Sequence, residues 1–305
     1  MTATTAPRAT TASTPTITRR RKPFSPVRAL LYVFLTAMAL GWIAPLALAF
    51  YASLRPYADT AEFGYMSLPH QLSFQYYKQA WDADLLKYFV NSLIIAVPSV
   101  LLVLFFASFV GFGISRYKIP GRKTLLIMFT AGNLLPPQVM VTPLYTIYRN
   151  IPVPEWLSSS GTLYDSYLGV ILIHVAFQTG FCVFVLYNYM QTIPTELTEA
   201  ALVDGAGVWR QYWQVILPLT RPALGALATL EFTWVYNDFL WALVLMSTGD
   251  KYPVTSALNN LRGQFFTDYN LLAAGSVLVA LPTLIVFFVL QKQFISGLTL
   301  GANKG

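Results

Sequence analysis

The sequence predicts an all-α, polytopic membrane protein, and three observations lead to this fold class. The 305 residues are 55% hydrophobic and only 11% charged, whereas typical globular chains are roughly 25% charged. Several apolar runs approach the ~20 residues that a helix needs to cross the hydrocarbon core of a bilayer. The Lys and Arg residues lie beside these runs, so the net charge of +7 reflects membrane topology and not a nucleic-acid partner.

The beginning of the chain is rich in Thr, Ala and Pro, which predicts a disordered tail over residues 1–26. Residues 27–305 then form the transmembrane domain. Ala47-Leu48-Ala49 resembles a signal-peptidase site. However, the apolar run that contains it is longer than the roughly 7–15 residues of a signal-peptide core, and further apolar runs follow. We therefore expect an uncleaved first span.

Hydropathy predicts six membrane spans in all, with edges uncertain by a few residues. They cover residues 29–51, 91–115, 124–148, 167–189, 222–246 and 270–291. The single cysteine, Cys182, lies in the fourth span and has no second cysteine with which to form an intramolecular disulfide. It is expected to be a packed thiol.

The basic residues in the connecting segments predict the orientation of these spans. The N-terminal segment, the 116–123 loop, the 190–221 loop and the C-terminal tail together carry 14 Lys and Arg, and the remaining loops carry 6. Positively charged loops stay on the cytoplasmic side, so both termini and the 190–221 loop are expected to be cytoplasmic.

The first outer loop, residues 52–90, carries four acidic residues and the aromatic residues Trp81, Tyr57, Tyr65, Tyr76 and Tyr77. Its length is sufficient to fold over the outer mouth of a pore or to receive a partner from outside. An interfacial hairpin held by aromatic anchors is an equal alternative.

The cytoplasmic loop of residues 190–221 reads as two short helices joined at a glycine. Thr195 is a suitable N-cap, and Glu199 lies in the first turns, where a carboxylate favours the helix dipole. Gly205 ends this helix, because glycine accepts the left-handed conformation that stops one. The second helix places an apolar stripe on one face, so Arg210, Gln211 and Gln214 are expected to turn away from the bundle. The first helix then projects as a small rod with an acidic tip, which suits a groove in another protein. The stripe consists of Trp209, Tyr212, Trp213 and Ile216.

This loop resembles the EAA loop of the permeases of ATP-binding-cassette importers. The shared pattern is Glu-Ala-Ala, Gly four positions later and Leu-Pro twelve positions after that, with Val215 in place of the usual Ile. In that family the loop is a coupling helix that docks in a cleft of the ATPase subunit and converts ATP-driven closure into movement of the permease. The matching residues are Glu199, Ala200, Ala201, Gly205, Leu217 and Pro218.

Three further stretches resemble the carbohydrate, maltose-type (MalG-like) branch of this family. They are residues 236–241 (YNDFLW), the 115–122 loop and the tail of residues 291–305. The resemblance implies a bacterial cell-membrane permease that imports a di- or oligosaccharide by alternating access. It also implies three partners: a second, MalF-like permease, a cytoplasmic ABC ATPase dimer and an external sugar-binding protein. ATP and Mg²⁺ would bind to the ATPase, so no cofactor is expected in this chain.

Several polar side chains fall within the predicted spans, where they usually face a cavity or a partner helix. Proline crowding in the third span should break its helix, and broken backbone is tolerated where water or protein covers it. Carboxylate, amide and indole groups are also those that bind sugars. For Asp238 and Asn237 the alternative is a helix cap or a tie between helices, and for His174 it is a helix–helix hydrogen bond. The residues expected to line a translocation path are Asn133, Gln138, His174, Gln178, Glu231, Trp234, Asn237 and Asp238.

The sequence contains no pattern typical of a catalytic, cofactor or metal site. Gly121-Arg122-Lys123-Thr124 lacks the glycine spacing of a phosphate-binding loop, and the two histidines lie far apart. Two alternative functions remain: a membrane-embedded, glycosyltransferase-like enzyme, and a proton-coupled secondary carrier. Each would use Glu231 and Asp238 and would leave the EAA pattern unexplained.

Overall fold

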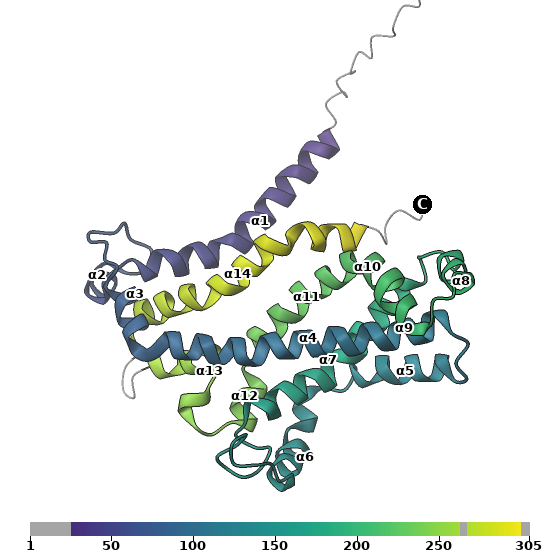
Figure 1. Ribbon diagram of the computed structural model, residues 1–305. Coiled ribbons are helices and arrows are strands. Elements are labelled where there is room, and N and C mark those ends of the chain that lie inside the picture. Colours follow the sequence, from purple (N-terminus) through teal and green to yellow (C-terminus); the bar gives the residue numbers. More distant parts are fainter. Residues whose placement is uncertain (1–25, 263–266, 300–305) are drawn as a thin grey trace, which may run out of the picture. The chain divides into compact units, whose positions relative to one another are not determined.

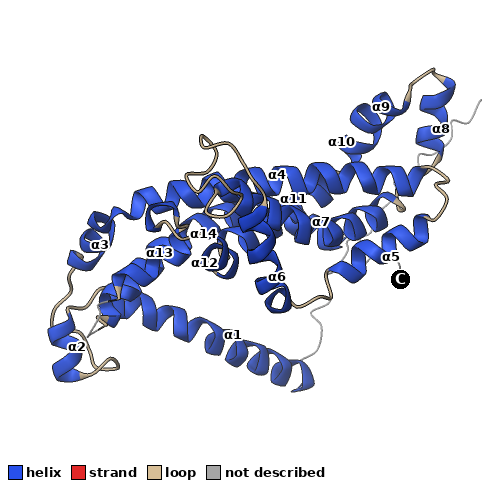
Figure 2. Cartoon of the chain, turned by 90° about the horizontal axis from the view of Figure 1, so that it is seen from below, coloured by secondary structure: helices blue, strands red, loops and turns tan. Residues whose placement is uncertain are grey.

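The computed structural model describes residues 26–262 and 267–299, and side chains in the last segment as far as Lys292. The predicted disordered tail, apart from Pro26, therefore lies outside the described residues, and the 291–305 motif is described as far as Thr299 in its backbone and as far as Lys292 in its side chains. The described residues are helical apart from turns, short loops and one isolated bridge between Pro152 and Thr162 (Figure 2). The prediction of an all-α fold is confirmed.

The chain divides into two compact units at Leu48. The described part of the first unit is the beginning of α1 (Pro26–Ser53), an apolar helix with Pro45 inside it. The second unit begins at Ala49 and holds all the other helices. Within it, α2 (Tyr57–Phe63) and α3 (Gln75–Ala80) are followed by a kink at Trp81–Leu85, where Ala83 and Asp84 are not helical, and by the long helix α4 (Leu86–Arg116).

Four helical stretches among the described residues are long and apolar enough to cross a membrane. They are α1, the continuous stretch Gln75–Arg116, α7 (Tyr167–Met190) and the beginning of α14 (Tyr269–Thr299). Two bent pairs also pass the test of length and composition, which gives up to six spans if each pair counts as one.

The two bent pairs show where the predicted spans differ from straight helices. Residues 124–148 correspond to α5 (Arg122–Gly132) and α6 (Pro137–Asn150), whose axes meet at 94°. The stretch Val208–Leu219 is bent by 73° against α11 (Arg221–Tyr236). The predicted span over 222–246 consists of two helices, because α11 ends at Tyr236 and a separate short helix, α12 (Leu240–Leu245), follows.

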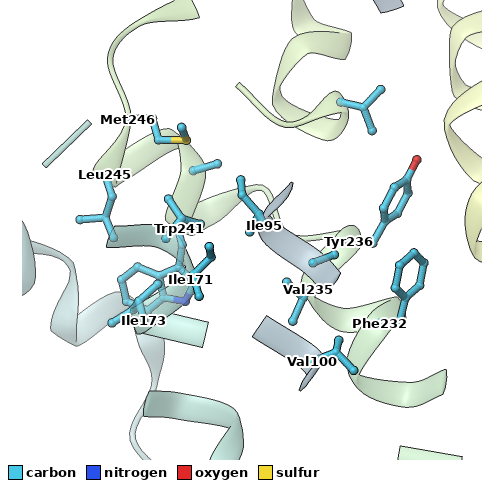
Figure 3. Close-up of a cluster of buried hydrophobic side chains, with 14 of the residues drawn as sticks. Ile95, Val100, Ile171, Ile173, Phe232, Val235, Tyr236, Trp241, Leu245 and Met246 are labelled. Atoms are coloured by element: carbon cyan, nitrogen blue, oxygen red, sulfur yellow. The ribbon is translucent and has the colours of Figure 1, made fainter. Parts of the chain in front are cut away.

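A cluster of buried apolar side chains joins α4, α7, α11 and α12 (Figure 3). Ile95 and Val100 of α4 belong to it, together with Ile173 of α7 and Val235 and Tyr236 of α11. Lipid is as apolar as these side chains, so close packing holds such helices together in a membrane. Gly180 of α7 illustrates this requirement, because a Cβ atom there would lie 2.3 Å from the carbonyl oxygen of Phe129 in α5.

The connecting segments lie at the two ends of α4, with α13 (Val254–Ala257) near its beginning and α8 (Glu196–Val203) and α9 (Val208–Arg210) near its end (Figure 1), and hydrogen bonds hold them there. At its beginning, Asn91 donates to the carbonyls of Asp250 and Tyr252, and the Ser92 hydroxyl accepts from the Val254 amide. At its end, Arg116 donates to the carbonyls of Met190 and Ile193. The connections near the beginning include η3 (Gly249–Lys251), α13 (Val254–Ala257) and η4 (Leu258–Leu261).

The first outer loop is folded around a buried arginine. The fully buried Arg55 forms an ion pair with Asp59 at 2.6 Å and donates to the Ser67 hydroxyl at 2.8 Å. Asn270 of α14 donates to the carbonyls of Ala52 and Arg55. The loop therefore carries two short helices and is fixed to α14 by hydrogen bonds.

Candidate functional site

The break between α5 and α6 follows from the prolines that occupy it. Asn133 caps the end of α5, and Pro136 is extended, as expected of a residue that precedes proline. Pro137 then begins α6, where its missing N–H costs no hydrogen bond. The side chain of Asn133 donates to the carbonyl of Phe129 at 3.0 Å. The predicted break in the third span is thus present, and it turns the chain sharply beside α7.

One face of α7 presents polar and aromatic side chains to this break. His174, Phe177, Gln178 and Phe181 recur at i, i+3, i+4 and i+7, the spacing of one helix face. Ser166 caps the beginning of α7, since its hydroxyl accepts from the Gly169 amide at 3.0 Å. From the sequence we selected His174 and Gln178 for this face. The helical spacing of three and four residues, applied to the same stretch, would also have selected Phe177 and Phe181.

The break between α11 and α12 is stabilised by the side chains of the two residues that begin it. The Asn237 amide donates to the Thr233 carbonyl at 2.8 Å, and the Asp238 carboxylate accepts from the Trp241 amide at 3.1 Å. Asp and Asn favour helix ends because their side chains bind free backbone groups. The sequence leaves a capping role open for Asn237 and Asp238. In the structure both side chains bind backbone groups at this break.

These three segments enclose a cavity of about 450 Å³. Five of the residues predicted for the translocation path line it: Asn133, His174, Gln178, Trp234 and Asp238. The other lining residues are Leu135, Pro137, Phe177, Phe181 and Trp241. Amides, an imidazole, a carboxylate and flat aromatic rings thus surround one space, as a polyhydroxylated solute requires.

The polar groups of the cavity are held in place by packing. His174 is buried, and its Nε2 atom lies 3.8 Å from a carboxylate oxygen of Asp238, beyond hydrogen-bond distance. That nitrogen has no hydrogen-bond partner within the part of the chain that the structure describes. Trp241 packs against Phe177 with ring centroids 5.3 Å apart. The helix–helix hydrogen bond considered for His174 is not formed at Nε2.

Three of the predicted path residues lie outside this cavity. Glu231 was expected to share a face with Asp238, but it is fully buried against α7 and accepts a hydrogen bond from Cys182 at 3.1 Å. Asn237 and Gln138 are exposed and are not among the lining residues. Conversely, Trp241 lines the cavity although it was quoted only as part of a motif. Because helix α11 ends at Tyr236, Asp238 does not continue the helix face on which Glu231 lies.

The EAA segment forms a short helix that ends at its glycine. Helix α8 (Glu196–Val203) is followed by Gly205 with φ = +75°, the left-handed conformation that glycine adopts without strain. The Ala206 amide donates to the Ala201 carbonyl at 2.8 Å across this turn. Thr195 occupies the N-cap position, although its side chain makes no capping hydrogen bond.

The side chains of α8 face in two directions. Glu199 lines a depression of about 300 Å³ together with Arg116 at the end of α4. Ala200 is exposed, and the apolar residues Leu202 and Val203 are 65% and 88% exposed. The projecting end of the rod is therefore apolar as well as acidic.

The second helix of the loop differs from its predicted register. It consists of α9 (Val208–Arg210), a π-helical stretch η2 (Gln211–Ile216) and α10 (Leu217–Leu219), where Leu217 and Pro218 are partly buried. Tyr212 and Ile216 are buried as expected. The prediction that Gln211 turns away is wrong, because Gln211 is buried and donates to the Ala206 carbonyl at 2.8 Å. The wider π turn changes the angle between successive side chains.

The fold and the cavity define a class of protein: a helical membrane protein with a cavity of polar and aromatic side chains between its helices and a helical loop at one end. Comparison with known proteins identifies the family. Residues 81–299 match the family described as "Binding-protein-dependent transport system inner membrane component". The chain belongs to this family and is a permease component of such a transporter, so the enzyme and secondary-carrier alternatives are not favoured.

Individual relatives agree with this membership. A probable ABC transporter permease protein of Pyrococcus horikoshii is 32% identical over 86% of this chain and 92% of its own length. The arabinooligosaccharides transport system permease protein AraQ of Bacillus subtilis is 30% identical over 94% of this chain and 99% of its own length. The crystal structure of a bacterial ABC transporter that imports the acidic polysaccharide alginate contains a chain with a TM-score of 0.75 and 22% identity, over 90% of this chain and all of that one. This last likeness concerns the fold.

Proposed function

We propose that this chain forms one half of the membrane path of a sugar importer, and that the solute is a di- or oligosaccharide. The cavity between α5, α6, α7, α11 and α12 is the observation that carries the proposal, because it gathers hydrogen-bonding groups and aromatic faces in one space. AraQ, a relative aligned over nearly all of this chain, is named for the transport of oligosaccharides.

The proposed assembly contains three further components. A second, MalF-like permease completes the path, and an external binding protein delivers the sugar. A cytoplasmic ABC ATPase dimer binds ATP and Mg²⁺ and receives α8 in a cleft. The exposed apolar end of α8, with Leu202 and Val203, suits such a cleft because its burial in a partner removes apolar surface from water. Both termini of the chain lie on the same cytoplasmic side.

The coupling role can be tested on the complete transporter reconstituted in liposomes. We expect sugar-stimulated ATP hydrolysis to fall at least tenfold in Glu199→Lys, which places a second positive charge beside Arg116. We expect a similar loss in Gly205→Asp, because a side chain at φ = +75° is strained and the end of α8 moves. Glu155→Lys, a charge reversal on an exposed residue between α6 and α7, is the control and should retain the activity. Retention of full stimulation in both coupling variants would rule out the coupling role.

A further inference from the structure

The wall of the cavity carries a carboxylate and no basic side chain. Neither Lys nor Arg is among its ten lining residues. These are Asp238, two residues with amide side chains, one histidine, one proline and five aromatic or apolar residues. The side chain of Asp238 is 17% exposed, so its carboxylate is within reach of a solute in the cavity. One of its oxygens already accepts from the Trp241 amide, which fixes its position.

The basic residues that flank these helices are bound elsewhere. Arg116 donates to two carbonyls at the far end of α7, and the Lys251 ammonium contacts a carboxylate oxygen of Asp165 at 3.2 Å. The Arg149 guanidinium lies over the ring of Tyr145 at 5.7 Å. No Lys or Arg among the described residues lies within salt-bridge distance of the Asp238 carboxylate, and the Nε2 atom of the His174 imidazole lies 3.8 Å away.

The Asp238 carboxylate specifies what kind of group suits this wall, because the Nε2 atom of His174 is buried and not accessible from the cavity. A hydroxyl group on a solute can donate a hydrogen bond to this carboxylate. A carboxylate or sulfate on a solute can only accept, and it would stand beside a like charge in a partly desolvated space. A neutral sugar thus suits the Asp238 carboxylate, whereas the charged group of an anionic sugar is repelled by it.

We infer that the cavity selects its solute by charge: it admits neutral and amino sugars and excludes uronic acids and other anionic sugars, with Asp238 as the residue that sets this selectivity. The inference rests on the proposed function, since it requires the cavity to lie on the translocation path. It assigns a substrate class to this chain's half of the path, whatever the binding protein delivers.

The test measures the charge preference of the cavity directly and does not depend on the identity of the sugar. Gln178→Cys is introduced into the complete transporter, because Gln178 lines the cavity beside His174. The thiol is treated with three methanethiosulfonates of similar size that carry a sulfonate, a trimethylammonium or a neutral hydroxyl group. Each rate is divided by the rate of the same reagent with a small free thiol. The parent transporter gives the background of Cys182, which is buried.

We expect the neutral reagent to react about tenfold faster than the sulfonate, and the cationic reagent to react faster still, as one nearby negative charge in a partly hydrated site requires. Adding Asp238→Asn should bring the three rates to within about twofold. Asparagine also caps a helix, so this variant retains the beginning of α12. Adding Glu231→Gln is the matched control, since this carboxylate is buried against Cys182 outside the cavity. It should leave the preference unchanged.

The remaining outcomes separate this inference from the proposed function. Equal rates for the three reagents in Gln178→Cys would overturn charge selection and leave the cavity on the path. A preference that survives Asp238→Asn, or one that disappears in Glu231→Gln, would overturn the assignment to Asp238. A thiol that reacts with none of the reagents in any nucleotide state would remove the cavity from the path, and the inference with it.

Discussion

At the scale of single residues, Asp165 shows how one carboxylate organises a connection. It is buried, adopts φ = +56°, and accepts hydrogen bonds from the amides of Ser247 and Thr248 at 2.8 and 3.0 Å. The Thr248 hydroxyl and the Lys251 ammonium also donate to it. Burial alone would raise the pKa of Asp165, but these donors outweigh it and hold the pKa below its ordinary value of 3.8.

This lowered pKa predicts a pH dependence with a definite sign. A carboxyl group whose pKa is lower in the folded than in the unfolded state contributes its full stability above the unfolded pKa and loses it as the pH falls through the folded pKa. We expect Asp165→Asn to lower the free energy of unfolding at pH 7 by about 1–2 kcal/mol, because hydrogen bonds to a neutral amide are weaker. The difference between the variant and the wild type should shrink below about pH 4.

Thermal unfolding of the purified transporter between pH 3 and pH 7 measures this difference. Asparagine tolerates the left-handed conformation of residue 165, so the variant changes the charge and retains the backbone. Asp250→Asn is the control, since the side chain of Asp250 is 75% exposed in its ion pair with Lys87. Removal of such a pair should have an effect of less than about 1 kcal/mol. A difference for Asp165→Asn that stays constant down to pH 3 would contradict the role of its charge.

At the scale of elements, Gln211 connects the coupling loop to a membrane helix. Its side chain donates to the Ala206 carbonyl just after α8 and accepts from the Tyr117 hydroxyl just after α4, at 2.8 and 2.9 Å. Next to it, the Tyr212 hydroxyl bonds to Ser108 within α4 at 2.8 Å. Gln211 thus joins the turn after α8 to the end of α4 by a short chain of hydrogen bonds.

Replacement of this link should separate ATP hydrolysis from transport. Gln211→Leu leaves a buried carbonyl and a hydroxyl without their partner, at a cost of about 1–3 kcal/mol. We expect the amount of sugar transported per ATP hydrolysed in proteoliposomes to fall several-fold. Gln214→Leu changes an exposed residue of the same stretch, which bonds only to Arg210 among the described contacts, and should keep the wild-type ratio. An unchanged ratio in Gln211→Leu, at equal thermal stability, would show that the link transmits nothing.

The same elements show what could be predicted from the sequence and what could not. Hydropathy located the apolar helices, and Pro136 and Pro137 revealed the break in the third span, because these signals are local. Gln211 was misplaced because the prediction assumed 100° per residue, and the π turn that buries it depends on contacts with Tyr117 and Ala206. Glu231 was misplaced for a related reason: the partner of its carboxylate, Cys182, lies 49 positions away.

At the scale of the whole molecule, the connecting segments form two groups, one rich and one poor in Lys and Arg. The hydrogen bonds and ion pairs between segments join members of the same group. The 116–123 and 190–221 loops, which carry the excess of positive charge, contact each other through Arg116 and Tyr117. The 149–166 and 247–269 loops contact each other through Asp165 and Thr248, and the 52–90 and 247–269 loops do so through Lys87 and Asp250. Charge count and geometry are independent observations, so their agreement supports the proposed orientation.

This orientation predicts opposite labelling of two equally exposed positions. Trp156, between α6 and α7, is 84% exposed, and Val203, at the end of α8, is 88% exposed. In intact cells that produce the complete transporter, a membrane-impermeant maleimide should label Trp156→Cys and should label Val203→Cys only after the membrane is permeabilised. The buried Cys182 provides the unlabelled background. Because the proposed ATPase would cover the end of α8, the permeabilised membranes are also stripped of peripheral proteins before labelling. Exposure of the two positions is then matched, and a difference in labelling reports the side of the membrane and not the reactivity of the thiol. Labelling of Val203→Cys from outside would place α8 out of reach of any ATPase and would invert the topology on which coupling depends.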